Sequence, residues 1–249
     1  RNVLDKRQLS YKVLANSLYG GTGAMTSNFY EPNVAALITA IGRTLLGYAK
    51  RVMEGIYKER RVVISGEPYI VTATCIYGDT DSVFVKWQIV AAKGHSTLQE
   101  GTAVRGKDAL PLAIEISQKA EKLASACLRK PHTLEYEKTF LPWILLTRKR
   151  YAGYLYVTAE DNPELTSMGV VLRRRDNAKI TKTLYYKVLK NLLNIDLRKS
   201  YRLCLEAFRR VIRGDVELQD VESSKALRGH YAKPETIVHK GLAHRIAAR

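Results

Sequence analysis

The chain has 249 residues, enough for one large or two small domains with hydrophobic cores. Its 41 lysines and arginines against 24 aspartates and glutamates give a formal net charge of +17, a surplus that indicates a polyanionic partner such as nucleic acid. Three widely spaced cysteines exclude a disulfide framework and a cysteine zinc cluster, and the sequence has no apolar run of about 18 residues that would predict a membrane span.

The first predicted helix covers residues 5–19 and is expected to end at the glycines of residues 20–23. At about 100° per residue, Gln8, Lys12, Asn16 and Tyr19 fall within an arc of roughly 80° on one face of this helix. A lysine in this position can meet a polyphosphate as a point charge, and a tyrosine beside Gly20 can form a flat wall against a base or sugar. A solvated polar face is the alternative interpretation.

A second helix is predicted over residues 33–57, followed by a short strand at residues 62–64. The apolar, β-prone runs Tyr69–Ile76 and Val83–Val90 then flank a Gly-Asp-Thr-Asp turn, which predicts a β-hairpin with acid at its tip.

Asp79 and Asp81 are two residues apart at this tip, and residues i and i+2 of a strand point the same way, so the two carboxylates are expected to converge on one cation. Mg²⁺ suits such a site because it takes few carboxylates and fills its other positions with water and substrate phosphates. A plain solvated turn is the alternative, since glycine and aspartate are ordinary turn residues.

Residues 91–108 have the composition of a loop, and a third helix is predicted over residues 110–128. The alternating segment at residues 133–139 predicts a strand with Glu135 and Glu137 on one face. We expect either a third carboxylate near the acidic tip or an edge-strand glutamate without a catalytic role.

Strands at residues 144–147 and 151–157 are predicted to flank a basic tip, Arg148–Tyr151, which suits phosphate and groove contacts on a duplex. A solvated charged turn is again the alternative. The cluster Arg173–Asn177 favours backbone phosphate binding, since adjacent arginines repel each other without a nearby anion. Two helices rich in lysine and arginine follow at residues 181–193 and 197–213, and a soft domain boundary is predicted near residue 170.

In their order and spacing these segments resemble family B DNA polymerases, and the similarity is greatest to the delta-type replicative enzyme of eukaryotes and to its relatives in large DNA viruses. The first helix matches the pattern Lys-x-x-x-Asn-Ser-x-Tyr-Gly of the fingers, and the acidic turn matches Tyr-Gly-Asp-Thr-Asp-Ser of the palm. Three further segments are similar to palm and thumb elements: Leu134–Lys138 with Arg148–Gly153, Gly169–Asn177 and His239–Arg245.

The resemblance implies an α+β fold, namely a polymerase palm with an antiparallel sheet and packed helices, a C-terminal fingers helix and a helical thumb. The implied domains are residues 1–25 for the fingers, 26–170 for the palm and 171–249 for the thumb.

The resemblance also implies a role for each matched residue. The catalytic and metal-binding acids would be Asp79 and Asp81, with Glu137 as an accessory acid. Contacts to the incoming nucleotide would come from Lys12, Asn16, Tyr19 and Gly20, and contacts to DNA from Arg148, Lys149, Arg150, Tyr151, Arg174 and Arg175.

The implied activity is DNA-directed DNA polymerisation, with two Mg²⁺ ions as cofactors and with primer–template DNA and dNTPs as substrates. Further implied partners are a sliding clamp and accessory subunits, and no membrane is involved. The implied localisation is the nucleus for a cellular protein, or a viral replication site in the nucleus or cytoplasm.

The sequence is expected to be an internal piece of a longer protein, because it begins with Arg1 in the middle of a helical pattern and ends at Arg249 without a stop signal. The family's first palm aspartate motif does not occur in it. The isolated chain is therefore expected to bind primer–template without polymerising. Two alternatives remain open: a non-catalytic nucleic-acid-binding module, such as a degenerate polymerase subunit, and an RNA-directed polymerase with a paired-aspartate hairpin.

Overall fold

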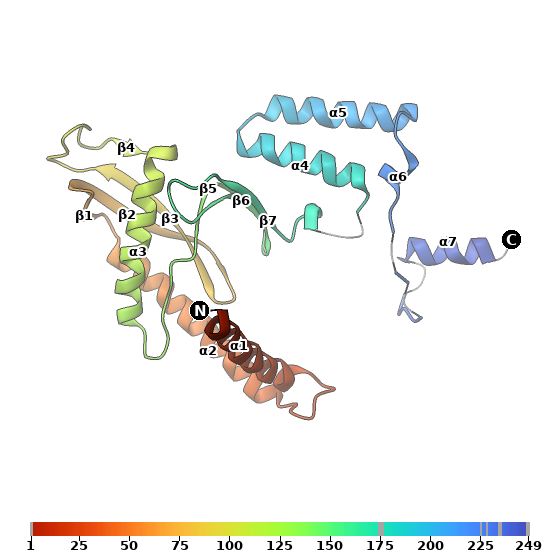
Figure 1. Ribbon diagram of the computed structural model, residues 1–249, viewed down its shortest axis with the longest axis horizontal. Helices are drawn as coiled ribbons and strands as arrows, with labels where there is room; N and C mark the ends of the chain where they lie inside the picture. The colour runs from red at the N-terminus through yellow and green to blue at the C-terminus, as the bar shows by residue number, and fades with distance from the viewer. Residues whose placement is uncertain (1, 174–176, 225, 228, 234–235, 248–249) are drawn as a thin grey trace. The chain divides into compact units, whose positions relative to one another are not determined.

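The computed structural model describes residues 2–173, 177–224, 226–227, 229–233 and 236–247 (Figure 1). The chain forms two compact units, Arg1–Thr139 and Phe140–Arg249. Each described unit combines helices with one antiparallel sheet, so the predicted α+β class is confirmed. The predicted boundaries near residues 25 and 170 concern polymerase subdomains and stay predictions.

The first unit opens with two long helices, α1 (Asn2–Gly23) and α2 (Pro32–Ile56), which contact each other. Helix α1 ends at Gly23, within the glycine-rich stretch where its end was predicted, and in its last turn the Thr22 hydroxyl donates to the carbonyl of Tyr19 at 2.7 Å. Proline at the first position of α2 suits a helix start, because its missing N–H would have had no partner there.

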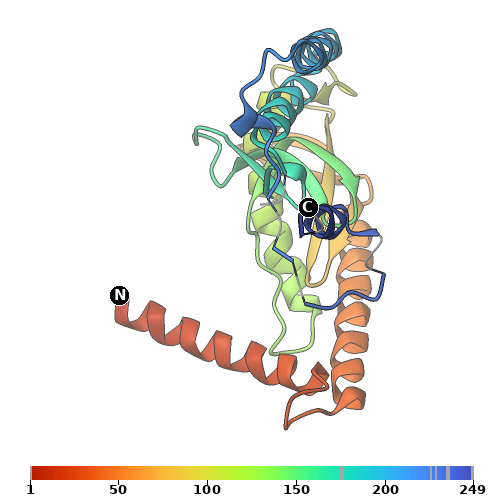
Figure 2. The same cartoon turned by 90° about the vertical axis from the view of Figure 1, so that its right-hand side faces the viewer.

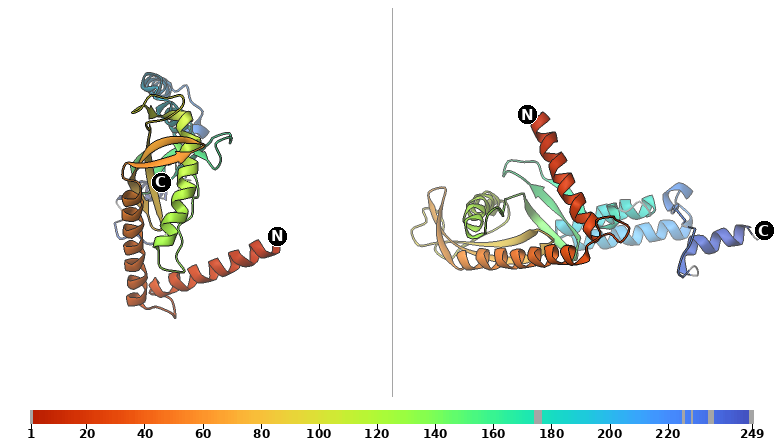
Figure 3. Two further views of the ribbon diagram at one scale, coloured as in Figure 1. Left: turned by 90° about the vertical axis from the view of Figure 1, so that its left-hand side faces the viewer. Right: turned by 90° about the horizontal axis from the view of Figure 1, so that it is seen from below.

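A four-stranded sheet in the order β1-β2-β3-β4 follows, with strands β1 (Arg60–Ile64), β2 (Glu67–Asp79), β3 (Ser82–Ala91) and β4 (Ala103–Val104). After the 3₁₀ turn η1 (Gly106–Asp108), helix α3 (Ala109–Cys127) runs along this sheet, as does α2 (Figure 3). The core joins both helices to the sheet and includes Met53 of α2, Tyr57 directly after it, Val71 and Ile89 of the strands, and Ile116 and Ala120 of α3. This packing buries one end of the β2–β3 hairpin and fixes its direction.

The predicted strand at residues 133–139 does not form, apart from its last residue, because α3 takes up its backbone groups. The Ser125 hydroxyl donates to the carbonyl of Leu134 at 2.8 Å and accepts from its amide at 2.9 Å. The Glu121 carboxylate accepts from the amide of Tyr136 at 2.8 Å. Side-chain bonds from a helix therefore replace the strand ladder that the alternating pattern predicted.

The second unit contains a three-stranded sheet, β5 (Thr139–Thr147), β6 (Arg150–Tyr156) and β7 (Glu164–Met168), of which β7 was not predicted. After η2 (Val171–Arg173), helices α4 (Lys179–Leu193) and α5 (Leu197–Arg213) pack against each other (Figure 2). Leu189 and Leu193 of α4 pack with Ala152 of β6 in a small core. Helices α6 (Leu218–Val221) and α7 (Val238–Ala247) complete the described chain.

Capping fixes both ends of α5. The Asp196 carboxylate accepts from the amide of Lys199 at 3.0 Å at the N-terminus, and Gly214 ends the helix in a left-handed conformation with φ 76°. Across the described part of the chain, none of the helices combines the length and apolar character that a membrane crossing requires.

Candidate functional site

The β2–β3 hairpin changes register just before its acidic tip. Cys75 pairs with Val85, but the next pair is Tyr77 with Phe84, so Ile76 has no partner and forms a β-bulge. The rings of Tyr77 and Phe84 lie 5.2 Å apart between centroids, which shows that the two side chains share a face beyond the bulge.

Asp79 and Asp81 both lie at the tip of the hairpin, but they do not alternate along one strand. Asp79 is the last residue of β2, whereas Asp81 lies in the two-residue turn and is exposed. Thr80 between them has a left-handed φ of 55°, and the amide of Asp81 donates to the carbonyl of Asp79 at 2.7 Å. This bond closes a γ-turn over Asp79–Asp81 within the tip, and the left-handed φ of its β-branched central residue is a strained conformation. The prediction that both residues occupy one strand face is wrong for this reason.

Neighbouring hydroxyls hold the first aspartate in place. The Thr80 hydroxyl donates to the Oδ1 atom of Asp79 at 3.2 Å, and the Ser82 hydroxyl donates to its carbonyl oxygen at 3.0 Å. Both bonds are local and tie the half-buried Asp79 to the turn that carries Asp81.

Helix α2 lies against the strand that leads to the acidic tip. A β-carbon on Gly78 would come within 3.3 Å of the Leu46 side chain, so the absent side chain lets helix and strand approach closely. The Oε1 atom of Glu54 accepts a hydrogen bond from the amide of Cys75 at 2.9 Å. Leu46 and Glu54 were not predicted as site residues, because each is an ordinary member of an amphipathic helix and no motif marks it.

The pKa of the Cys75 thiol, beside the bulge, lies above its ordinary value. Burial raises its pKa from the ordinary 9.0 to about 11, and the Glu54 carboxylate adds to that direction while Lys50 opposes it. This thiol is therefore protonated at neutral pH and fills space between α2 and β2.

The donor set at the tip fits a hard divalent cation, since Asp79 and Asp81 supply carboxylate oxygens and Mg²⁺ takes one or two carboxylates with water and phosphate oxygens. In the described residues, no three His, Cys, Asp or Glu side chains gather as a complete metal cage. Glu137 is accordingly not grouped with the two aspartates. Its side chain is 72% exposed and pairs with Lys138 at 2.7 Å.

Helix α1 carries the predicted nucleotide-binding residues on its surface. Lys12, Asn16, Tyr19 and Gly20 are all exposed, and no residue of α1 is buried. Because the helix is continuous over these positions, the predicted common face for Lys12, Asn16 and Tyr19 is confirmed.

The basic tip belongs to the second unit. Arg148 and Lys149 form the two-residue connection between β5 and β6, and Lys149 has a left-handed φ of 60°. Arg148, Lys149 and Arg150 are exposed, so the tip presents three cations to solvent. Tyr151 instead is only 6% exposed and packs its ring against those of Phe140 and Trp143, with centroids 6.0 and 5.9 Å away.

A second basic surface emerges on α5. At about 100° per residue, four of its arginines fall within an arc of about 60°, and all four are exposed. These are Arg198, Arg202, Arg209 and Arg213. The sequence indicated dense positive charge on this helix but not the stripe. The predicted DNA contacts Arg174 and Arg175 lie outside the described residues.

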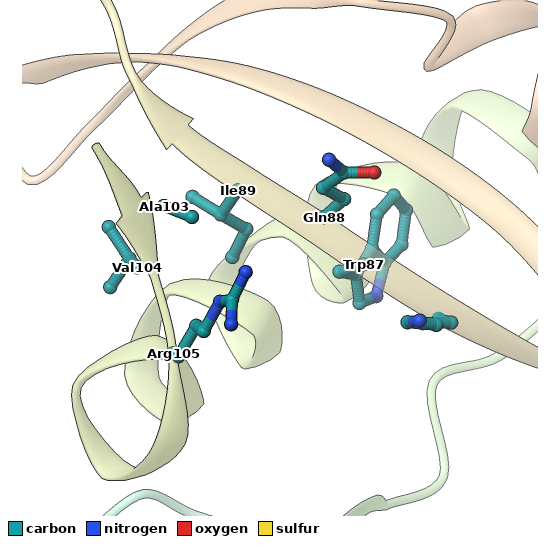
Figure 4. Close-up of a pocket in the computed structure, with 7 residues that line it drawn as sticks. Trp87, Gln88, Ile89, Ala103, Val104 and Arg105 are labelled. Atoms are coloured by element: carbon teal, nitrogen blue, oxygen red, sulfur yellow. The ribbon is translucent and has the colours of Figure 1, made fainter. Parts of the chain in front are cut away.

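The structure also contains a hollow of about 480 Å³ between β3 and β4, shown in Figure 4. Its labelled lining residues are Trp87, Gln88, Ile89, Ala103, Val104 and Arg105. No acidic side chain lines it, and the Trp87 indole donates to the Ser117 hydroxyl at 2.9 Å behind the strand. It therefore lacks the donors that a metal-dependent reaction needs, in contrast to the hairpin tip.

Comparisons with known proteins agree with these features. A DNA polymerase from Pyramimonas orientalis virus is 40% identical over 248 residues, which is 99% of this chain and 19% of the relative. A DNA polymerase from Phaeocystis pouchetii virus is 46% identical over 57% of the chain and 13% of the relative. The DNA polymerase delta catalytic subunit of Candida albicans is 29% identical over 100% of the chain and 22% of the relative.

The chain thus spans about a fifth of the length of the first and third of these relatives. The model of DNA polymerase family B matches residues 1–249, the whole length of the sequence. The acidic hairpin tip, the polar face of α1 and the full-length match together show that this chain belongs to DNA polymerase family B.

Proposed function

We propose that this chain contributes the catalytic acids of a DNA-directed DNA polymerase that adds nucleotides to a primer 3′-OH under the direction of a template. The observation that carries the proposal is the tip of the β2–β3 hairpin, where Asp79 and Asp81 stand on either side of the strained residue Thr80. Membership of DNA polymerase family B supports it.

The two aspartates are proposed to hold Mg²⁺, with Asp81 as the bridging ligand, Asp79 as a supporting acid and Glu137 as an accessory acid. Two bound Mg²⁺ ions would supply electrostatic stabilisation of the attacking and leaving oxygens. The chain's own contribution is to present oxygen ligands on a rigid turn, since the carboxylate of Asp79 and its backbone are both hydrogen-bonded within the tip.

Lys12 is proposed to contact the triphosphate of the incoming dNTP, because an exposed ammonium pairs with phosphate oxygens as a compact charge. Asn16 is proposed to lie beside it, and Tyr19 and Gly20 to line the nascent base pair. The uninterrupted helix supports a common surface for Lys12, Asn16 and Tyr19.

Duplex DNA is proposed to bind through phosphate contacts that do not read sequence. The exposed cations Arg148, Lys149 and Arg150 are suited to this role, and the arginine stripe of α5 adds a second basic surface. Tyr151, Arg174 and Arg175 are proposed contacts from the family resemblance. For Tyr151, contact with the primer end would require its buried ring to leave the aromatic cluster.

The proposed substrates are primer–template DNA and dNTPs, with a sliding clamp and accessory subunits as proposed partners. The proposed localisation is the nucleus for a cellular protein, or a viral replication site for a viral one.

Primer extension by the full-length protein tests the proposal. With Mg²⁺, a labelled primer and four templates that differ in the first unpaired base, the wild type should incorporate the complementary nucleotide on each template. A protein that binds the duplex but extends no primer would instead be a non-catalytic module. Preference for an RNA template would favour the RNA-directed alternative.

A further inference from the structure

We propose that Glu54 is a positioning residue for the acidic tip, although it lies on α2, outside the motifs that carry the resemblance. By holding the β-bulge at Ile76, it sets the register that puts Asp81 in the turn. The inference rests on the proposed function, since it assigns Glu54 a role in placing the catalytic acids.

The register shows what the bulge accomplishes. If the pairing of Cys75 with Val85 continued to the end of the hairpin, Asp79 would pair with Asp81 and only Thr80 would connect the strands. One residue is too short for an ordinary hairpin connection, and like charges directly opposite each other are destabilising. The bulge moves the pairing by one residue, so Asp79 pairs with Ser82 and Asp81 becomes part of the turn.

A bulge needs support because the extra residue interrupts the ladder of backbone hydrogen bonds. Glu54 supplies that support, since its Oε1 atom accepts from the amide of Cys75 at 2.9 Å, directly before the unpaired Ile76. A bond to a carboxylate is stronger than one between neutral groups, so this contact is well suited to fix an interrupted strand.

Glu54 is one of three residues on the face of α2 that contacts β2. Leu46, Lys50 and Glu54 are four residues apart, so they lie along one face of α2. The Leu46 side chain packs at Gly78, and the carbonyl of Lys50 lies 3.9 Å from the Cys75 sulfur. One row of α2 therefore follows β2 from the bulge to the tip, and Glu54 makes the hydrogen bond at its start.

The test compares three variants of the full-length protein: Glu54→Ala, Glu54→Gln and Met53→Ala. Glutamine keeps an oxygen acceptor of the same reach, so it should restore most of what alanine removes. Met53 is the neighbouring residue on α2, is 5% exposed and packs in the core, so its truncation destabilises the unit without touching the bulge.

Two readouts separate positioning from stability. Amide hydrogen exchange at Cys75 and Tyr77 should accelerate in Glu54→Ala and accelerate clearly less in Glu54→Gln, which keeps a neutral acceptor. Single-turnover primer extension should show a maximal incorporation rate reduced about 10- to 100-fold in Glu54→Ala, with the apparent Kd for dNTP within about threefold of wild type. The reason is that a displacement of about 1 Å at a catalytic group costs up to about 100-fold in rate. Glu54→Gln should retain most of the rate.

Unchanged exchange at Cys75 in Glu54→Ala would overturn the proposal, as would a loss of maximal incorporation rate in Met53→Ala equal to that in Glu54→Ala at equal folded fraction. If the wild type extends no primer, the proposed function fails and the catalytic role of Glu54 falls with it. The exchange data would then still decide whether Glu54 holds the bulge.

Discussion

Gly169 stands against the backbone carbonyl of Lys149 so closely that a β-carbon at this position would overlap the carbonyl oxygen. Gly169 also has a left-handed φ of 64°, and it directly follows β7, whose last residue Met168 pairs with Tyr151. The glycine thus lets the end of β7 pass directly behind the basic tip.

Gly169→Ala should destabilise the second unit by more than about 2 kcal/mol, because it combines backbone strain with a steric overlap against main chain. Gly214→Ala is the matched control, since Gly214 has φ 76° but no atom within 4 Å of the added β-carbon, and its cost should be about 1 kcal/mol. Chemical denaturation measures both variants. Equal losses in the two would contradict a close approach at Gly169.

Lys12→Ala in the full-length protein should lower kcat/KM for dNTP about 10- to 100-fold, since losing a hydrogen bond to a charged group costs about 1.5–3 kcal/mol. Steady-state kinetics with varied dNTP measures this loss. Lys6→Ala is the control, because Lys6 is exposed on the same helix but about 120° away from Lys12. A similar loss in Lys6→Ala would indicate general charge rather than a specific phosphate contact.

Arg148→Ala should weaken duplex binding uniformly across DNA sequences and reduce the dependence of log K on log salt concentration by about 1. Fluorescence anisotropy between low and moderate salt provides the slopes. Lys119→Ala serves as the control, since Lys119 is already paired with Glu115 at 2.7 Å on α3. If Arg148→Ala leaves the salt slope unchanged, Arg148 at the basic tip does not contact phosphate.

The Cys75 thiol should resist alkylation by iodoacetamide at pH 8 in the native protein. Its pKa of about 11 lies about two units above an ordinary thiol, which reduces the thiolate fraction about 100-fold. The exposed Cys127 provides the internal comparison, and mass spectrometry of digested protein measures both sites. Alkylation of Cys75 as fast as Cys127 would show that the α2–β2 contact opens readily.

The same pKa shift gives stability a defined dependence on alkaline pH. Because the pKa of Cys75 is raised in the folded state, the unfolded chain releases its proton at lower pH. The contribution of Cys75 to the free energy of unfolding is therefore complete below pH 9 and is lost as pH rises toward about 11. Cys75→Ser should remove this part of the decline, measured by denaturation at several pH values. A decline of the same size in Cys75→Ser would assign it to other groups.

The sequence predicted the elements whose hydrophobic period is strong and long. Helices α2, α3, α4 and α5 and the β2–β3 hairpin all formed close to their predicted bounds. The presence of Asp79 and Asp81 at one tip was predictable because both residues lie in one turn motif. This part of the site was predictable because its residues lie close together in the sequence.

Features that depend on distant partners were not predictable. The Glu54 bond to Cys75 joins residues 21 positions apart, and neither residue carries a local signal for a bulge. The segment at residues 133–139 alternates like a strand, yet the Ser125 and Glu121 side chains satisfy its backbone instead. The left-handed Thr80 contradicts local preference and is stabilised by the surrounding tip.

We propose that the hairpin tip is the catalytic centre of a DNA polymerase. The most direct measurement is single-turnover incorporation of one correct dNTP by wild type and Asp81→Asn in the full-length protein, at saturating primer–template and Mg²⁺. We expect the rate to be about 100- to 1,000-fold lower in Asp81→Asn, the range of losses caused by removing a principal stabilising group at an active site. Duplex affinity should stay within about threefold of wild type, because the proposed phosphate contacts come from other residues. An incorporation rate of Asp81→Asn within about tenfold of wild type would contradict this assignment, since it would show that the chemical step does not require this carboxylate.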